Sequence, residues 1–395
     1  MKKTLLLGSV LVATSVFAAS DADLLKAAKD AGLQALPTTQ AQVDAVLKDL
    51  GVKPNKFTEA KAELGKKLYF EPRLSKSGVI SCNTCHNLGL GGTDGVAAAV
   101  GHKWTVNPHH LNSPTVYNSV LNTTQFWDGR AMTLVDQAKG PIEAEPEMAT
   151  PAKLAVERIG SLPEYQAEFK KIYKDGVTFD NIADAIASFE RTLLTPSKFD
   201  KFMNGDLKAL NKDQKAGLKT FIDKGCATCH TGVNLGGSMQ AFEVAGKYKF
   251  ANLGDFKGDA NGMVKTPTLR NITETAPYFH NGAIWKLEEA VKEMGSIQLG
   301  IDISDAEAKS IINFLNALTG EKPKMLINQK PIDYKVNVRC LYFMETRHRV
   351  DLLNLLESTM DILVKAGILA DDNSTIVAGH DGSRVEYDKY TKINS

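Results

Sequence analysis

Two pentapeptides of one pattern, Cys-x-x-Cys-His, constrain this 395-residue chain more than any other feature. They occupy residues 82–86 (Cys-Asn-Thr-Cys-His) and 226–230 (Cys-Ala-Thr-Cys-His). Two thiols at this spacing can each form a thioether to one vinyl group of a porphyrin, and the adjacent histidine can bind the iron. A lone Cys-x-x-Cys could also be a redox dithiol or half of a zinc site. Two copies favour two covalent c-type haems, held by Cys82, Cys85, His86, Cys226, Cys229 and His230.

The N-terminus has the three parts of a secretory signal peptide. A Met-Lys-Lys start precedes the apolar residues 4–17, and small residues follow at Ala18 and Ala19. This pattern predicts a signal peptide of residues 1–18 and export, to the periplasm in a double-membrane bacterium. The apolar run is too short to span a bilayer, and no later stretch is long enough, so we expect no membrane segment.

Composition narrows the classes of partner. The net charge of +1 gives no general case for nucleic acid or anionic membrane as a partner. Of the five cysteines, the haem motifs use four and leave Cys340 alone. A disulfide framework is therefore excluded.

An internal repeat surrounds the two haem motifs. Each unit has a helix that leads into Cys-x-x-Cys-His, then Leu-Gly-Gly, then Pro-Thr-x-x-Asn, then an aromatic residue three positions before Gly. The segments are residues 65–70, 82–86, 90–92, 113–118 and 126–129 in the first unit, and residues 217–222, 226–230, 235–237, 266–271 and 279–282 in the second. A short helical pattern follows in each unit, near Leu134 and Leu287. The repeat predicts a duplicated cytochrome c-like domain whose copies differ in their tasks.

Hydrophobic periodicity and capping residues predict the helices. They are expected at residues 21–50 with a break near Pro37, and at 58–70, 151–173, 178–194, 211–225, 286–294 and 304–318. Loop-rich stretches at residues 71–149 and 231–285 wrap the haems. The predicted fold class is mainly α, with two cytochrome c-like haem domains, long loops and few strands.

The two units offer different groups for the sixth position of the iron. Met294 ends the short helix of the second unit and could be a thioether ligand, or core filler. The corresponding region of the first unit, residues 140–148, carries glutamates instead. A carboxylate above a haem suits general acid–base chemistry on peroxide, although a solvated acidic loop is the alternative.

Histidines and aromatic residues near the motifs leave further alternatives open. His102 is a candidate near the first haem, with His109 and His110 as competitors, and a lone loop histidine is often a surface residue. Trp127 and His280 occupy equivalent places in the repeat. One of them could bridge the haems, or both could be aromatic packing.

Residues 64–318 resemble the bacterial di-haem cytochrome c peroxidases. The resemblance is carried by residues 70–75, 82–92, 101–102, 112–118, 126–131, 137–148, 226–230, 266–271, 275–282 and 294–300. It implies that the first haem is the low-potential, peroxidatic one, and that the second is the high-potential haem where electrons enter. His86 and His230 match the proximal ligands, and Met294 matches the distal ligand of the second haem.

The resemblance also implies roles for other side chains. His102 matches the histidine that caps the first haem in the resting oxidised enzyme, and Glu147 matches the catalytic carboxylate. Trp127 matches the tryptophan between the haems. A calcium ion between the domains is implied by Asn112, whose side chain matches a ligand, with the carbonyls of Thr275 and Pro277.

The implied function is the reduction of hydrogen peroxide to water after reductive activation. An electron from a small cytochrome c or cupredoxin enters at the second haem, the loop holding His102 releases, and Glu147 assists proton transfer. The family is commonly a homodimer. The alternatives are a di-haem electron carrier or a protein-oxidising relative, and Met294 argues against the latter, which has tyrosine there.

The predicted domains are residues 1–18, 19–197, 198–324 and 325–395. The last segment departs from the family and resembles a C-terminal fragment of phage-type crossover-junction endodeoxyribonucleases, an α/β piece. Asp351 and Asp372 match two catalytic aspartates, whereas Leu353 replaces a third and Glu357 replaces a lysine. We therefore expect no nuclease activity and no nucleic-acid partner, with a DNA-binding fusion as the alternative.

Overall fold

The computed structural model describes residues 20–242, 248–327, 336–337, 341–344, 377–379 and 384–387. The chain divides into one unit up to Pro323 and a second from Lys324. Helices dominate the described residues and strands are short, so the prediction of a mainly α fold is confirmed. None of the described helices has the length and apolar character needed to cross a membrane. The predicted signal peptide, residues 1–18, lies outside the described residues.

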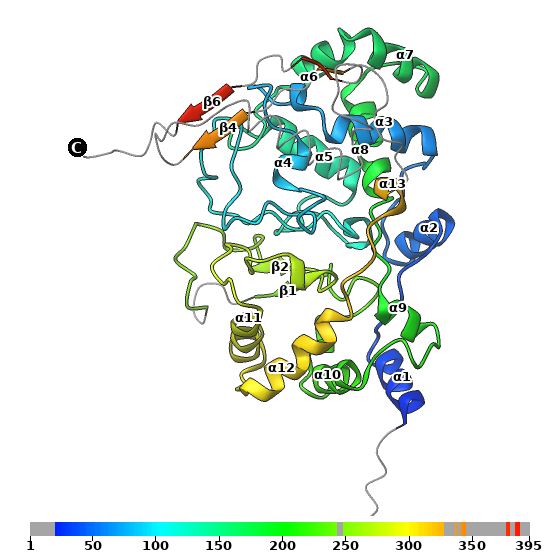
Figure 1. The fold of residues 1–395 in the computed structure, drawn as a ribbon, viewed down its shortest axis with the longest axis vertical. Coiled ribbons are helices and arrows are strands. Elements are labelled where there is room, and N and C mark those ends of the chain that lie inside the picture. The colour runs from blue at the N-terminus through cyan, green and yellow to red at the C-terminus, as the bar shows by residue number, and fades with distance from the viewer. Residues whose placement is uncertain are drawn as a thin grey trace, which may run out of the picture. The chain divides into compact units, whose positions relative to one another are not determined.

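Twelve α-helices and two short strands are described in the first unit (Figure 1). The helices are α1 (Asp21–Asp30), α2 (Gln40–Asp49), α3 (Glu59–Tyr69), α4 (Cys82–Cys85), α5 (Leu134–Glu143), α6 (Ala152–Gly160), α7 (Pro163–Ile172), α8 (Phe179–Glu190), α9 (Lys198–Met203), α10 (Lys212–Asp223), α11 (Leu287–Met294) and α12 (Asp305–Asn316). The strands β1 (Met239–Ala241) and β2 (Met263–Lys265) pair antiparallel.

Most predicted helices are confirmed within a few residues, because capping residues mark their starts. The side chains of Thr58, Asn211 and Ser304 accept hydrogen bonds from backbone N–H groups of the first turns of α3, α10 and α12. The single helix expected at residues 151–173 is wrong, since α6 and α7 are separate. Leu162 is extended because it precedes Pro163, which begins α7. The short α9 was not expected.

The first haem half is built on the crossing of α3 and α8 (Figure 1). The helices approach so closely at Gly65 that a Cβ there would lie 1.8 Å from the carbonyl oxygen of Ala185. Near this crossing, the rings of Tyr69 and Phe189 meet edge-on with centroids 5.1 Å apart. Gly65 is therefore required by the close backbone contact.

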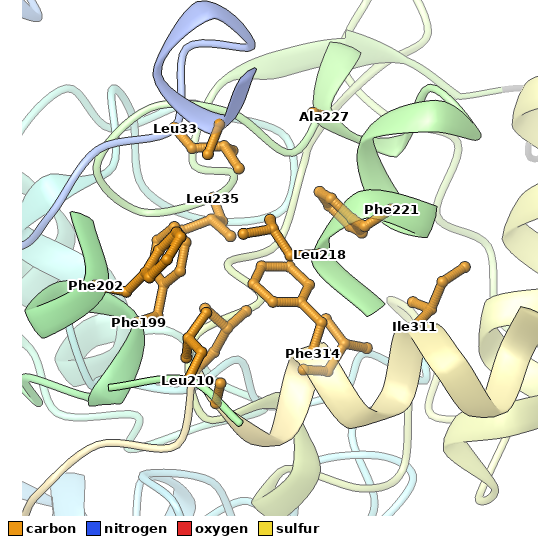
Figure 2. Close-up of a cluster of buried hydrophobic side chains, with 14 of the residues drawn as sticks. Leu33, Phe199, Phe202, Leu210, Leu218, Phe221, Ala227, Leu235, Ile311 and Phe314 are labelled. Atoms are coloured by element: carbon orange, nitrogen blue, oxygen red, sulfur yellow. The ribbon is translucent and has the colours of Figure 1, made fainter. Parts of the chain in front are cut away.

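The second half repeats this arrangement with α10 and α12. A Cβ at Gly217 would lie 2.1 Å from the carbonyl oxygen of Ser310, and the rings of Phe221 and Phe314 have centroids 5.2 Å apart. Figure 2 shows both rings inside one apolar cluster, into which Leu33, just after α1, also points. Residues near the N-terminus thus complete the core of the second half.

The loops of the two halves also follow one backbone plan. Asn118 and Asn271 both adopt left-handed conformations, with φ of 59° and 60°, and both side-chain amides donate to the hydroxyl of Thr195 at 2.8 Å. Phe126 and Phe279 match as well, with φ of 67° and 69°. Positive φ is uncommon for such residues, so these pairs support the internal repeat.

The second unit is described only in short segments. These are α13 (Lys324–Ile327) and the strands β3 (Val336–Asn337), β4 (Leu341–Met344), β5 (Val377–Gly379) and β6 (Arg384–Tyr387). β3 pairs with β5 and β4 with β6, both in parallel. Cys340, Asp351, Leu353, Glu357 and Asp372 lie outside the described residues.

Candidate active site

One largely apolar cavity of about 330 Å³ is lined by residues of both haem motifs. All six predicted attachment and proximal residues lie in its wall: Cys82, Cys85, His86, Cys226, Cys229 and His230. An apolar wall with convergent thiols and imidazoles is what a covalently bound porphyrin requires.

The first motif presents its imidazole in a fixed orientation. α4 places Cys82 and Cys85 on one helical turn, and the backbone N–H of His86 donates to the carbonyl of Cys82 at 2.9 Å. Nδ1 of His86 lies 2.9 Å from the carbonyl oxygen of Pro114. That contact assigns the proton to Nδ1 and leaves Nε2 free to bind iron. Burial lowers the pKa of His86, which favours the neutral, ligating form.

The second motif offers an equivalent ligand. Nδ1 of His230 lies 3.2 Å from the carbonyl oxygen of Leu235, and burial lowers the pKa of His230 to about 4. The imidazole is therefore neutral near pH 7, with Nε2 available. The residues present thus fit two c-type haems.

Glu147 is one of two carboxylates that the first half places in the cavity wall; the other is Glu190. It follows α5, where its backbone N–H donates to the carbonyl of Ala144 at 3.0 Å. Burial raises the pKa of Glu147, and the nearby positive charge of Arg130 opposes that rise. Arg130 is held over the ring of Phe126, 3.6 Å from its centroid, and pairs with Asp128 at 2.8 Å. Glu147 can therefore exchange protons in the cavity.

The backbone of His102 lies beside the backbone of Glu147, but His102 does not line the cavity. Its backbone N–H donates to the carbonyl of Glu147 at 2.7 Å. The side chain is 6% exposed, and its Nε2 has no hydrogen-bond partner in the described part of the chain. The residues lining the cavity include neither His102 nor its competitors His109 and His110. His109 instead contacts Asp255 at 3.0 Å.

In the second half, Met294 is the candidate ligand for the sixth position of the iron. It ends α11 and lines the cavity, directly before a π-helical turn at Gly295–Leu299. Single π-helical turns often occur at functional sites, because they re-aim a side chain. A thioether in the cavity wall favours the ligand interpretation over core filling.

Trp127 connects the two halves. Its indole N–H donates to the carbonyl of Asn112 at 2.9 Å, and its own carbonyl accepts from the backbone N–H of Lys265 at 2.8 Å. The ring lies edge-on to His280, with centroids 6.4 Å apart. Trp127 lines the cavity, whereas His280 does not belong to its described lining.

The predicted calcium ligands share the same wall. Asn112, Thr275 and Pro277 all line the cavity. The side-chain amide of Asn112 donates to the carbonyl of Val96 at 2.8 Å, which leaves its oxygen for a cation. No group of three or more His, Cys, Asp or Glu suited to a metal occurs among the described residues. A site of amide and carbonyl oxygens does not need one.

Three charged side chains in the wall were not singled out from the sequence: Arg130, Glu190 and Lys265. Burial raises the pKa of Glu190 to about 8 and lowers that of Lys265 to about 8. Arg130 and Lys265 flank repeat segments, so a comparison of the two units could have drawn attention to them. Glu190 lies on an ordinary amphipathic helix and gives no such signal.

Two protein families match this chain. Residues 59–208 match the family described as di-haem cytochrome c peroxidase, and residues 214–319 match cytochrome c. The cytochrome c551 peroxidase of Pseudomonas aeruginosa is 47% identical over 285 residues, which cover 68% of this chain and 81% of that protein. The cytochrome c551 peroxidase of Nitrosomonas europaea is 49% identical over 271 residues, covering 66% and 80%.

A solved structure shows the same arrangement of the chain. The crystal structure of a MauG-like protein associated with microbial copper homeostasis superposes with a TM-score of 0.59 at 25% identity. The superposition covers 68% of this chain and 91% of that one.

Proposed function

Because the chain belongs to the di-haem cytochrome c peroxidases, we propose that it reduces hydrogen peroxide to water at its first haem with electrons that enter at its second. It is a cytochrome-c peroxidase, an oxidoreductase with peroxide as the acceptor, and it carries two c-type haems. One observation carries the division of labour. The cavity wall holds Glu147 in the first half and Met294 in the second.

The proposed chemistry assigns separate tasks to these side chains. His86 and His230 would hold the haem irons through Nε2, and Met294 would bind the second iron. The bound haems supply the electrons that cleave the O–O bond, with two electrons and two protons consumed per peroxide. Glu147 accepts the proton of one peroxide oxygen and returns it to the other, which lowers the barrier to cleavage. Arg130 favours the ionised form that this step requires.

We propose that His102 caps the first iron in the resting oxidised enzyme and releases on reduction. The backbone bond from His102 to the carbonyl of Glu147 supports this role, because it ties the loop to the catalytic carboxylate.

Calcium and Trp127 are proposed to couple the halves. Asn112 supplies a side-chain oxygen and Thr275 and Pro277 supply carbonyls to the ion. The backbone carbonyl of Asn112 also accepts a hydrogen bond from the indole N–H of Trp127. Asn112 would therefore contact both the calcium ion and the indole. Trp127 would then lie on the electron path between the haems.

The remaining assignments follow the family and the N-terminal pattern. We propose removal of residues 1–18 on export to the periplasm, a small cytochrome c or cupredoxin as donor, and a homodimer. The peroxidatic domain is residues 19–197 and the electron-transfer domain is residues 198–324. Residues 325–395 are proposed to contribute no nuclease activity. A di-haem electron carrier or protein-oxidising relative is the alternative, and Met294 disfavours the protein-oxidising class.

Partial reduction separates these functions. The protein is reduced by one electron with calcium present, and peroxide and a reduced small cytochrome c are then added. We expect a high-spin first haem, followed by stoichiometric donor oxidation and loss of peroxide. An electron carrier would stay low-spin and consume no peroxide, and that result would overturn the proposal.

A further inference from the structure

Glu190 is a buried carboxyl that the mechanism above leaves without a task. It ends α8, is 6% exposed and lines the cavity. Its Oε2 atom has no hydrogen-bond partner within the described part of the chain. Buried polar atoms are nearly always paired, so an unpaired one in a cavity wall needs an explanation.

The groups on which Glu190 acts electrostatically belong to the first haem motif or contact it. Burial raises the pKa of Cys82 of α4 and of Tyr69 of α3, and the charge of Glu190 adds to both rises. The hydroxyl of Tyr69 donates to the carbonyl of His86 at 2.6 Å. Glu190 therefore belongs to the surroundings of the first haem, on the side of the Cys82 attachment.

In the described part of the chain, the cations on the neighbouring helices interact with other groups. Lys139 of α5 pairs with Asp180 at 2.6 Å, and Arg158 of α6 donates to the carbonyl of Ser75 at 2.5 Å. On α8's own end, the Arg191 guanidinium pairs with Asp44. The buried Lys66 of α3 interacts electrostatically with Glu63. The titratable groups on which the charge of Glu190 acts are Tyr69 and Cys82, and attachment to the haem removes the thiol of Cys82.

The second half provides an internal comparison. Gly65 contacts Ala185 across the first helix crossing, and Gly217 contacts Ser310 across the second. Counting five residues on from these partners, Glu190 corresponds to Leu315, which also lines the cavity and is 2% exposed.

Counting four residues on from the two glycines, Tyr69 corresponds to Phe221, which packs on Phe314 as Tyr69 packs on Phe189. Figure 2 shows Phe221 and Phe314 within the apolar cluster. The second half has apolar side chains at these places, so it does not incur the free-energy cost of burying a carboxyl. A polar pair is kept only where the proposed peroxide chemistry occurs.

We propose that Glu190 is the proton acceptor of the first haem: its carboxylate takes up one proton from solvent when that haem gains one electron, and releases it when the electron leaves. The proton balances the charge of the added electron, so no bond other than O–H of the carboxyl is formed or broken. An added negative charge nearby disfavours a carboxylate, which is the physical cause of the coupling. Burial raises the pKa of Glu190 to about 8, so the group can change state near neutral pH. The inference rests on the first haem site proposed above.

A redox titration of both haems at several pH values, without peroxide, tests this coupling. We expect the potential of the first haem to fall as pH rises from about 6 to about 9, because the ferrous form holds the extra proton. The slope approaches a tenfold change in the reduction equilibrium per pH unit, about 59 mV. In Glu190→Gln this Glu190-dependent slope should be lost, while the second haem, read in the same sample, should behave as in the parent protein.

Two further variants test the assignment. Glu190→Asp keeps a titratable group and should retain the slope with a shifted midpoint, whereas Tyr69→Phe keeps the carboxyl and should retain it as well. An unchanged pH dependence of the first haem in Glu190→Gln, at full haem content, would overturn the proposal.

Infrared spectroscopy keeps the test decisive if Glu190→Gln fails to bind haem. The reduced-minus-oxidised spectrum of the parent protein should gain a protonated-carboxyl band when the first haem is reduced, and Glu190→Asp should shift that band. Absence of the band, or a band that Glu190→Asp leaves in place, would overturn the proposal. Neither measurement involves peroxide, so its result is independent of whether the protein turns over peroxide.

Discussion

The two haem-binding halves share a backbone plan and differ in the side chains that they turn to the cavity. Both cross two helices at a glycine, both hold left-handed Asn and Phe residues at matching places, and both fix an imidazole through a backbone carbonyl. The first half adds Glu147 and Glu190 to the wall, and the second has Met294 and Leu315.

This difference separates structure from chemistry. Shared features hold a macrocycle and an iron ligand, and they are needed wherever a c-type haem is bound. Among the described residues that line the cavity, carboxyl groups occur only in the half assigned to peroxide, where protons must move. Met294 and Leu315 lie in the half assigned to electron transfer, where a thioether ligand and apolar surroundings favour a high potential.

The largest effect is expected from Glu147→Gln. Removal of the carboxylate that accepts the peroxide proton should lower kcat by about 10²- to 10⁴-fold with both haems retained. Donor oxidation measures the turnover, and absorbance measures the haem content. Glu143→Gln, an exposed carboxylate on the neighbouring α5, is the matched control and should keep normal turnover. An active Glu147→Gln enzyme would remove this residue from the mechanism.

Met294→His should affect the other half. Replacement of a thioether by imidazole should lower the potential of the second haem by on the order of 0.1 V, within the roughly 0.8 V that axial ligands span. Electron entry should then slow by about tenfold, while a fully pre-reduced sample still reacts with peroxide. Potentiometry and stopped-flow absorbance measure the two effects. An unchanged second-haem potential would show that Met294 is not the ligand.

Arg130→Gln should shift the pH dependence of peroxide reduction at the first haem. Glu147 must be ionised to accept a proton, so activity is lost as pH falls through its raised pKa. Arg130 lowers that pKa, and its removal should move the acidic limb of kcat/KM to higher pH, by about one unit or less. Arg130→Lys keeps the charge and serves as control. A limb that moves to lower pH, or does not move, would contradict the electrostatic role of Arg130.

The smallest effect is expected from deletion of residues 325–395. Every residue that lines the cavity lies before Pro323, so peroxidase activity and both potentials should stay within about twofold of the parent protein, a range smaller than the loss of one hydrogen bond. Steady-state assays on the truncated and full chains measure this. A large loss would mean that the second unit supports the haem-binding unit.

The order of the helices and the repeat could be predicted from local patterns. Capping residues such as Thr58 and Ser304 mark helix starts through short-range hydrogen bonds, which depend only on nearby sequence. The split between α6 and α7 was missed although Pro163 is visible in the sequence, because the amphipathic pattern continues across it. The helix ends there because the residue before a proline is sterically disfavoured in the helical conformation.

The candidate site could be predicted only in part. The haem motifs and the family resemblance led to Cys82, His86, Glu147 and Met294, and all four line one cavity. The resemblance also led to His102, which the fold places outside that wall. Neither route led to Glu190, because its partners on α3 and α4 lie more than one hundred residues away in the chain.

The sequence by itself determined that two haems are attached, where each is attached, and that the two units are copies, because thioether chemistry and tandem repetition are local properties of the chain. The tertiary structure decided which side chains share the cavity wall. It brought α8 onto α3 at Gly65 and α12 onto α10 at Gly217, and so set Glu190 beside one haem motif and Leu315 beside the other. Burial, unlike motif spacing, depends on these long-range contacts, and burial gives the Glu190 carboxyl a pKa near neutrality.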